Sequence, residues 1–74
     1  MPEHQTKQIK IVVNGEERWA PGDANISTVL QVLGIDGGRV AVELNRGIVR
    51  KSEWETTPVA DGSTLEIVQF VGGG

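Results

Sequence analysis

The chain has no cysteine among its 74 residues. This absence excludes a disulfide framework, a thiolate metal site and a cysteine nucleophile, and it is compatible with a reducing cytosol. Any sulfur chemistry in which the protein takes part must therefore use sulfur that comes from outside the chain.

An excess of positive charge is missing as well. Seven Lys and Arg residues stand against ten Asp and Glu residues, which gives a formal net charge of −3. No long basic run interrupts this acidic balance, so we predict neither a nucleic-acid partner nor an anionic membrane partner.

Long apolar runs are also absent. No segment approaches the ~20 apolar residues that cross a bilayer, and the polar residues 1–8 lack the apolar core of a signal peptide. We predict a cytoplasmic protein in which residues 1–7 form a disordered leader.

The small size of the chain limits what it can do alone. A domain of this length buries only about 60% of its unfolded surface, which leaves little room for a catalytic cleft. Aromatic residues are scarce, and we interpret Trp19 and Trp54 as core or partly buried residues because so small a core needs their area. Size therefore favours a carrier or binding module over an enzyme.

Alternation of apolar and polar residues predicts several strands. The first is residues 9–13, followed by an Asn14-Gly15 hairpin turn and a charged returning strand at an edge, residues 16–20. Three further strands are predicted, over residues 40–44, 48–49 and 64–71.

One segment has the period of a helix. Apolar residues recur at i, i+3, i+4 and i+7 from Ile26, which predicts a short amphipathic helix over residues 26–33. Asn25 is the expected N-cap, Gly34 ends the helix, and Ile35 is placed to pack back on its last turn. So short a helix needs a sheet to hold its apolar stripe.

Two connections have local signals of their own. Residues 36–39 are predicted to be a loop. Residues 50–55 are predicted to form a single helical turn, capped by Ser52 and with Trp54 pointing inward, and Asp61-Gly62 marks a later turn.

The order of these elements predicts an α+β fold. A right-handed crossover through the helix places the last strand beside the first, in the middle of a mixed sheet of four to five strands covered by one main helix. This is the ubiquitin-like β-grasp fold, and we assign it to residues 8–71.

The last strand leads directly into three glycines, Gly72, Gly73 and Gly74. Glycine has no Cβ, so an extended glycine run fits a narrow channel and carries a terminal carboxylate ~10 Å from the folded body. This tail either enters another protein's active site or is a flexible terminus or linker.

Several of these features together resemble the sulfur-carrier family of thiamine biosynthesis, ThiS. They are the β-grasp order, the Asn14-Gly15 hairpin, the segment 49–54, the Asp61-Gly62 turn and the ending 70–74. The resemblance covers residues 8–74. Its more specific part is the combination of a basic residue, an acidic residue and Trp before the last strand with an apolar segment that runs into the terminal glycines.

The resemblance implies a carrier that is activated by partners and has no catalytic or metal-binding residues. A ubiquitin-activating-type adenylating enzyme would use ATP to adenylate Gly74, a sulfur donor protein would convert the adenylate to a thiocarboxylate, and thiazole synthase would take the sulfur. Gly72 and Gly73 would thread the tail into these partners. No cofactor would be bound by the carrier itself.

Partner docking is predicted at the end of the last strand. Val68 and Phe70 lie on its outer side, directly before Val71 and the tail, and an exposed aromatic residue there would be a reasonable anchor. The alternative is that a helix or loop covers them.

Other candidates are weaker. Arg46, Arg50 and Lys51 read as a solvated basic cluster, and His4 has no partner that would suggest a metal or catalytic role. Gly37-Gly38 lacks the lysine and the strand-to-helix context of a phosphate loop.

Two alternatives to the thiamine carrier stay open. One is the small subunit of molybdopterin synthase, which shares the fold and the diglycine end but usually has a proline-containing approach to the tail. The other is a β-grasp interaction module whose glycines are only a linker, which would tolerate loss of Gly74.

Overall fold

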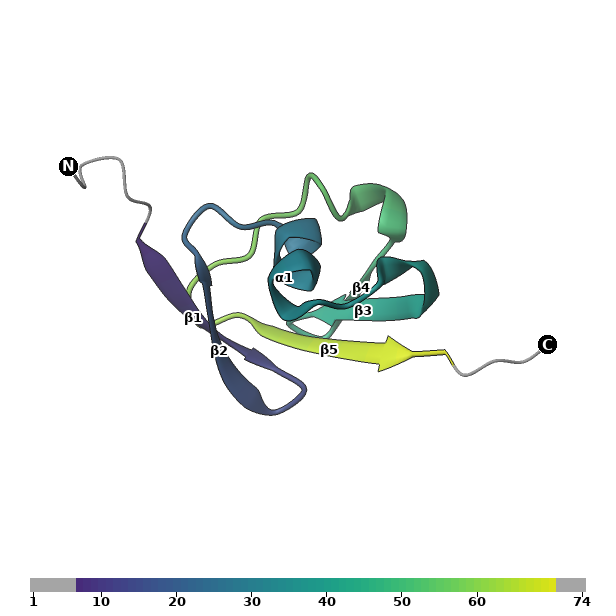
Figure 1. The fold of residues 1–74 in the computed structure, drawn as a ribbon, viewed down its shortest axis with the longest axis horizontal. Coiled ribbons are helices and arrows are strands. Elements are labelled where there is room, and N and C mark those ends of the chain that lie inside the picture. The colour runs from purple at the N-terminus through teal and green to yellow at the C-terminus, as the bar shows by residue number, and fades with distance from the viewer. Residues whose placement is uncertain (1–6, 71–74) are drawn as a thin grey trace.

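The computed structural model describes residues 7–70, which form a five-stranded mixed sheet with one α-helix against one face (Figure 1). The strand order is β2-β1-β5-β3-β4. The elements in chain order are β1 (Gln8–Val13), β2 (Glu16–Pro21), α1 (Ile26–Leu33), the 3-10 helix η2 (Gly37–Arg39), β3 (Val40–Leu44), β4 (Gly47–Val49), the 3-10 helix η3 (Lys51–Glu53) and β5 (Thr64–Gln69).

The predicted topology is confirmed. β5 lies between β1 and β3, parallel to the first and antiparallel to the second, so the last strand is beside the first in the middle of the sheet. This is the β-grasp arrangement. It places the chain's last described residues at the end of a central strand rather than an edge strand.

The hairpin between β1 and β2 has the expected geometry. Asn14 and Gly15 both have positive φ, 51° and 84°, and Val13 pairs with Glu16 across them. β2 is an edge strand, as its charged sequence predicts.

The prediction that Trp19 belongs to the core is wrong. Its side chain is 59% exposed, because it lies on an edge strand opposite Lys10, on the sheet face that α1 does not cover. The Lys10 ammonium lies 5.5 Å from the centre of the indole ring, a cation–π contact that uses the ring at the surface.

Helix α1 forms where the sequence predicts it. The Asn25 side chain accepts a hydrogen bond from the Thr28 amide at 2.8 Å. At the other end Gly34 has φ 71°, and the Ile35 amide donates to the Leu30 carbonyl at 2.9 Å. These caps satisfy the terminal backbone groups of a helix that is held by its apolar stripe.

The core lies between α1 and the facing side of the sheet. Each central strand contributes alternate residues to it, so the hydrophobic pattern of the sequence maps directly onto burial. The buried apolar side chains are Ile11, Val13, Ala20, Ala24, Ile26, Val29, Leu30, Val40, Val42, Trp54, Val59, Leu65 and Ile67.

Three local predictions need correction. The segment 36–39 contains the 3-10 helix η2, because the Asp36 carboxylate accepts from the Gly38 amide at 2.9 Å and tightens the turn. Ser52 does not cap η3, which begins at Lys51 after Arg50 without a side-chain cap. Strand β5 ends at Gln69 rather than at residue 71.

Trp54 is buried, as predicted, and its ring leaves no room for a side chain at Gly37. The indole nitrogen donates to the Val49 carbonyl at 2.9 Å, which fixes the ring. A Cβ added at Gly37 would lie 2.8 Å from Cζ3 of that ring. We expect Gly37→Ala to lower the free energy of unfolding by about 1–3 kcal/mol in urea denaturation.

Gly47→Ala is the matched control for Gly37→Ala. A Cβ at Gly47 would meet only the Leu44 carbonyl oxygen at an ordinary 3.6 Å, so its effect should stay below about 1 kcal/mol. Equal losses in the two variants would show that the contact with Trp54 has no special cost.

No helix within residues 7–70 has the length and apolar character needed to cross a bilayer. The predicted leader, residues 1–7, lies outside the described residues except for Lys7.

Candidate functional site

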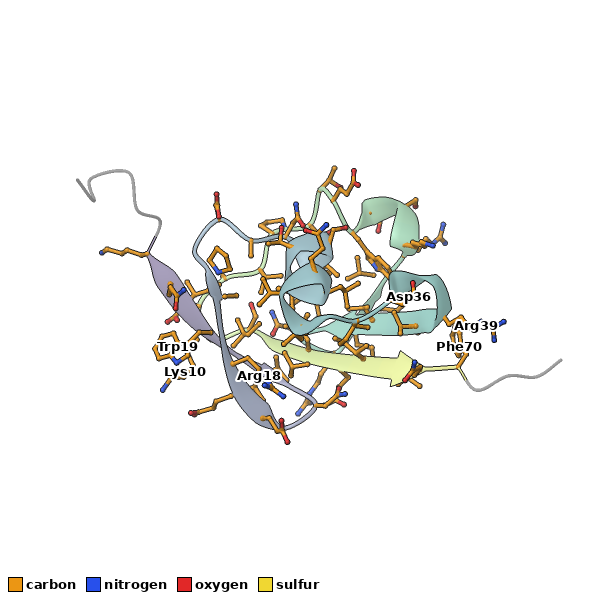
Figure 2. All side chains as sticks on the ribbon, in the orientation of Figure 1. Lys10, Arg18, Trp19, Asp36, Arg39 and Phe70 are labelled. Atoms are coloured by element: carbon orange, nitrogen blue, oxygen red, sulfur yellow. The ribbon has the colours of Figure 1, made fainter. Side chains whose placement is uncertain are left out.

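The candidate site is the C-terminal end of β5, directly before the residues predicted to form the tail. The Phe70 amide donates to the Arg39 carbonyl at 2.8 Å, so the sheet holds the chain up to this residue. Figure 2 shows Phe70 and Arg39 together at the C-terminal end of β5. Val71, Gly72, Gly73 and Gly74, which the sequence predicts to be docking and tail residues, lie outside the described residues.

The two faces of β5 have different environments. Leu65 and Ile67 are buried beneath α1, while Val68 and Phe70 are 58% and 57% exposed. The possibility that a helix or loop covers these two side chains is therefore wrong. Two apolar residues are presented on the surface directly before the tail.

Neighbouring strands extend this apolar surface. Residues directly opposite each other in an antiparallel pair share a face. Ala41 of β3 pairs with Val68, and Ile48 of β4 pairs with Glu43, two positions further along β3. We call Ala41, Ile48, Val68 and Phe70 the open-face patch.

Sequence reasoning missed Ile48, which is 75% exposed. Strand β4 is too short for an alternation of apolar and polar residues to show which side chain faces outward. Only the register with β3 shows it. With Phe70 at one end and Ile48 at the other, the patch spans β5, β3 and β4 on the side of the sheet away from α1.

Charged residues adjoin the open-face patch, and Glu43 lies directly opposite its member Ile48. Glu43 and Glu66 pair with each other on the same face, one row away from Ala41 and Val68. Arg46 and Arg50 flank the two ends of β4, and both are exposed, as is Lys51. Within residues 7–70 the ion pairs involve only the first hairpin, Lys10 with Glu17 and Arg18 with Glu16.

The described residues contain no cluster of three or more His, Asp or Glu side chains that could hold a metal. A groove of about 410 Å³ lies between the first hairpin and the C-terminal part of α1. It is lined by Val13, Asn14, Glu16, Arg18, Val32, Leu33 and Ile35, and so includes none of the predicted site residues. The surface around Phe70 therefore suits contact with a partner rather than catalysis by its own side chains.

The chain matches the ThiS family over residues 6–74. It is 32% identical over 63 residues to the sulfur carrier protein ThiS of Bacillus subtilis, a match that covers 84% of this chain and 96% of that relative. The crystal structure of a thiamine biosynthesis protein (ThiS) from Geobacter metallireducens superposes with a TM-score of 0.77 at 29% identity, covering 89% of this chain and 100% of the other.

Two longer relatives also match. A thiazole synthase from Paramagnetospirillum magneticum is 47% identical over 66 residues, which cover 89% of this chain. This chain spans 20% of the length of that relative, and the same share of a thiazole synthase from Magnetococcus marinus. From the family match, together with the Bacillus relative and the Geobacter structure, the chain belongs to the ThiS family.

Proposed function

We propose that Gly74 of this chain is adenylated and then converted to a thiocarboxylate that supplies sulfur for thiazole formation. The observation that supports this most is the position of the tail. In the sequence it follows the central strand β5 directly, after the exposed residues Val68 and Phe70, in a chain of the ThiS family.

The proposed chemistry has two steps. An α-carboxylate has a pKa of about 3.3–3.7, so at neutral pH it is an anion and a poor electrophile. Its oxygen attacks the α-phosphorus of ATP and displaces pyrophosphate, which leaves an acyl-adenylate. A sulfur nucleophile such as hydrosulfide then attacks the acyl carbon, AMP leaves, and a thiocarboxylate and a proton result.

The partners perform the catalysis in this proposal. A ubiquitin-activating-type enzyme binds ATP, a sulfur donor protein supplies sulfur, and thiazole synthase consumes it, all in the cytoplasm. The carrier binds no cofactor and contributes the reacting carboxylate, with Gly72 and Gly73 as the segment that enters the partner. The absence of a side chain at these positions suits a narrow channel.

The thiazole synthase relatives support one of these partners. In each of them a region similar to this chain accounts for a fifth of a longer protein named thiazole synthase. Joining a carrier to the enzyme that uses its cargo raises their effective concentration. We propose that this chain delivers its sulfur to the same kind of enzyme.

The adenylation step is tested by pyrophosphate exchange. The chain is mixed with the adenylating enzyme of its own genome, ATP and labelled pyrophosphate, and the label entering ATP is counted. We expect exchange that requires the chain and saturates with its concentration. Exchange at the same rate without the chain, or none with it, would contradict the proposal.

We expect Phe70→Ala to weaken binding to the adenylating enzyme by about ten- to thirtyfold, because an exposed aromatic anchor is lost. The free energy of unfolding should change by less than about 1 kcal/mol, since the side chain is mostly exposed. Titration calorimetry measures the affinity, and urea denaturation measures the stability.

Val32→Ala is the control for Phe70→Ala. Val32 is also an exposed apolar residue, but it lies on α1, on the other side of the sheet. It should leave affinity unchanged. Equal weakening of the affinity by both variants, or strong unfolding of the Phe70 variant, would show that the open-face patch is not the docking surface.

A further inference from the structure

Strand β1 is too short to accompany β5 to its end. The parallel pairing stops at Val12 with Thr64 and Val13 with Leu65, and the Asn14 amide adds one bond to the Leu65 carbonyl at 2.9 Å. The chain then turns back into the hairpin. Beyond Leu65, no strand among residues 7–70 pairs with this edge of β5.

The side chain of Asn14 takes over where the strand stops. Its Oδ1 accepts from the Ile67 amide at 2.7 Å, and its Nδ2 donates to the Ile67 carbonyl at 3.1 Å. A carboxamide has the same donor and acceptor as a peptide group, so it reproduces the pairing of one further strand residue. The φ of 51° at Asn14 is tolerated by asparagine and directs the side chain from the turn to the strand.

Within residues 7–70, Asn14 makes the last hydrogen bonds along this edge of β5. Peptide groups along a strand point alternately to the two sides. Phe70 bonds to Arg39 on the β3 side, so the peptide groups of Gln69 face the Asn14 side. No described residue hydrogen-bonds to them there.

We propose that Asn14 is a positioning residue for the tail: its two hydrogen bonds to Ile67 set the path along which the strand delivers Gly74 to the adenylating enzyme. This inference rests on the proposed function. Asn14 would act through β5, without touching the reacting carboxylate or ATP itself. Losing it removes the hydrogen bonds on the β1 side of Ile67, while β5 keeps its pairing with β3 up to Gln69, so this part of the strand is held from one side alone.

The chain supplies a matched control at Asn45. This residue also has positive φ, 50°, in a turn, and its Oδ1 accepts from the Thr64 amide at 2.9 Å. Asn45 therefore holds the first residue of β5 with a side-chain amide, as Asn14 holds Ile67 further along the strand. Glycine tolerates both backbone conformations, so Asn14→Gly and Asn45→Gly remove the side-chain contacts without straining the turns.

The first measurement is amide hydrogen exchange by NMR. Asn14→Gly should lower the protection of the Ile67 amide by about tenfold more than it lowers the global protection, and Asn45→Gly should do the same at Thr64. Asn14→Asp keeps the acceptor and should retain most of the protection at Ile67. Unchanged protection of Ile67 in Asn14→Gly would overturn the proposed contact.

The second measurement is carrier-dependent pyrophosphate exchange. We expect Asn14→Gly to raise the KM for the carrier by about tenfold with little change in kcat, and Asn45→Gly to leave both values near those of the unmodified chain. Equal KM and kcat values for the two glycine variants would overturn the proposed role of Asn14 but not the proposed function. An unmodified chain that supports no pyrophosphate exchange would overturn the proposed function instead. Amide hydrogen exchange at Ile67 would still test the contact with Asn14.

Discussion

Deleting Gly74 is expected to abolish sulfur loading while leaving the fold intact. Removing one glycine moves the reacting carboxylate back by ~3.5 Å relative to Phe70. A misplacement of even 1 Å is able to cost about 100-fold in rate, so we expect a loss of at least about 100-fold in carrier-dependent pyrophosphate exchange. The urea midpoint should not change, because the buried core lies within residues 11–67.

Two further variants sharpen the Gly74 prediction. An alanine added after Gly74 should be as damaging as the deletion, because it moves the terminal carboxylate onto an alanine and one residue further from Phe70. A glycine added before Met1 changes the length equally and should have no effect. Full activity of the chain without Gly74 would favour the β-grasp module in which the glycines are only a linker.

The largest effect on stability is expected from Leu65→Ala. Leu65 is fully buried near the beginning of β5, and its carbonyl accepts a hydrogen bond from the Asn14 amide, which links β5 to β1. A buried leucine replaced by alanine costs about 2–5 kcal/mol. A domain of this size has a total stability of about 4–11 kcal/mol, so the loss is a large fraction of it. Urea denaturation followed by tryptophan fluorescence measures the change.

Val68→Ala is the control for Leu65→Ala. It truncates an aliphatic residue of the same strand on the exposed face, and it should cost less than about 1 kcal/mol. If the two variants lost equal stability, the assignment of inner and outer faces of β5 would be wrong. The pair therefore tests the register that exposes Phe70 as well as the core.

The fold could be predicted from the sequence because its signals are local and repeated. Ile11, Leu65 and their neighbours alternate with polar residues, the helix has both of its caps, and the hairpin has the turn pair that its φ angles require. Each of these features needs only a few consecutive residues. Their order and the handedness of crossovers then decide the topology.

Features that depend on long-range neighbours could not be predicted in this way. The edge position of its strand was predicted, but Trp19 is exposed because its side chain lies on the sheet face away from α1, and that depends on the pairing with β1. Ile48 joins the open-face patch only through the register between β4 and β3. The bonds from Asn14 to Ile67 join residues 53 positions apart, although the Asn-Gly pair itself is read easily as a turn.

The site was predicted in part for the same reason. The exposure of Val68 and Phe70 follows from their alternation with buried residues along β5 and is confirmed. Their role in docking, and the roles of Gly72, Gly73 and Gly74, stay predictions. They depend on a partner's surface, which the sequence of the carrier does not encode.

The most direct test of the account is the intact mass of the chain after incubation with its adenylating enzyme, ATP and sulfide. The account predicts a single increase equal to the replacement of one oxygen by sulfur, confined by fragmentation to Gly74 and absent when ATP is omitted. A mass that stays unchanged although pyrophosphate exchange proceeds, or sulfur found at any other residue, would contradict the claim that this chain carries sulfur on its terminal glycine.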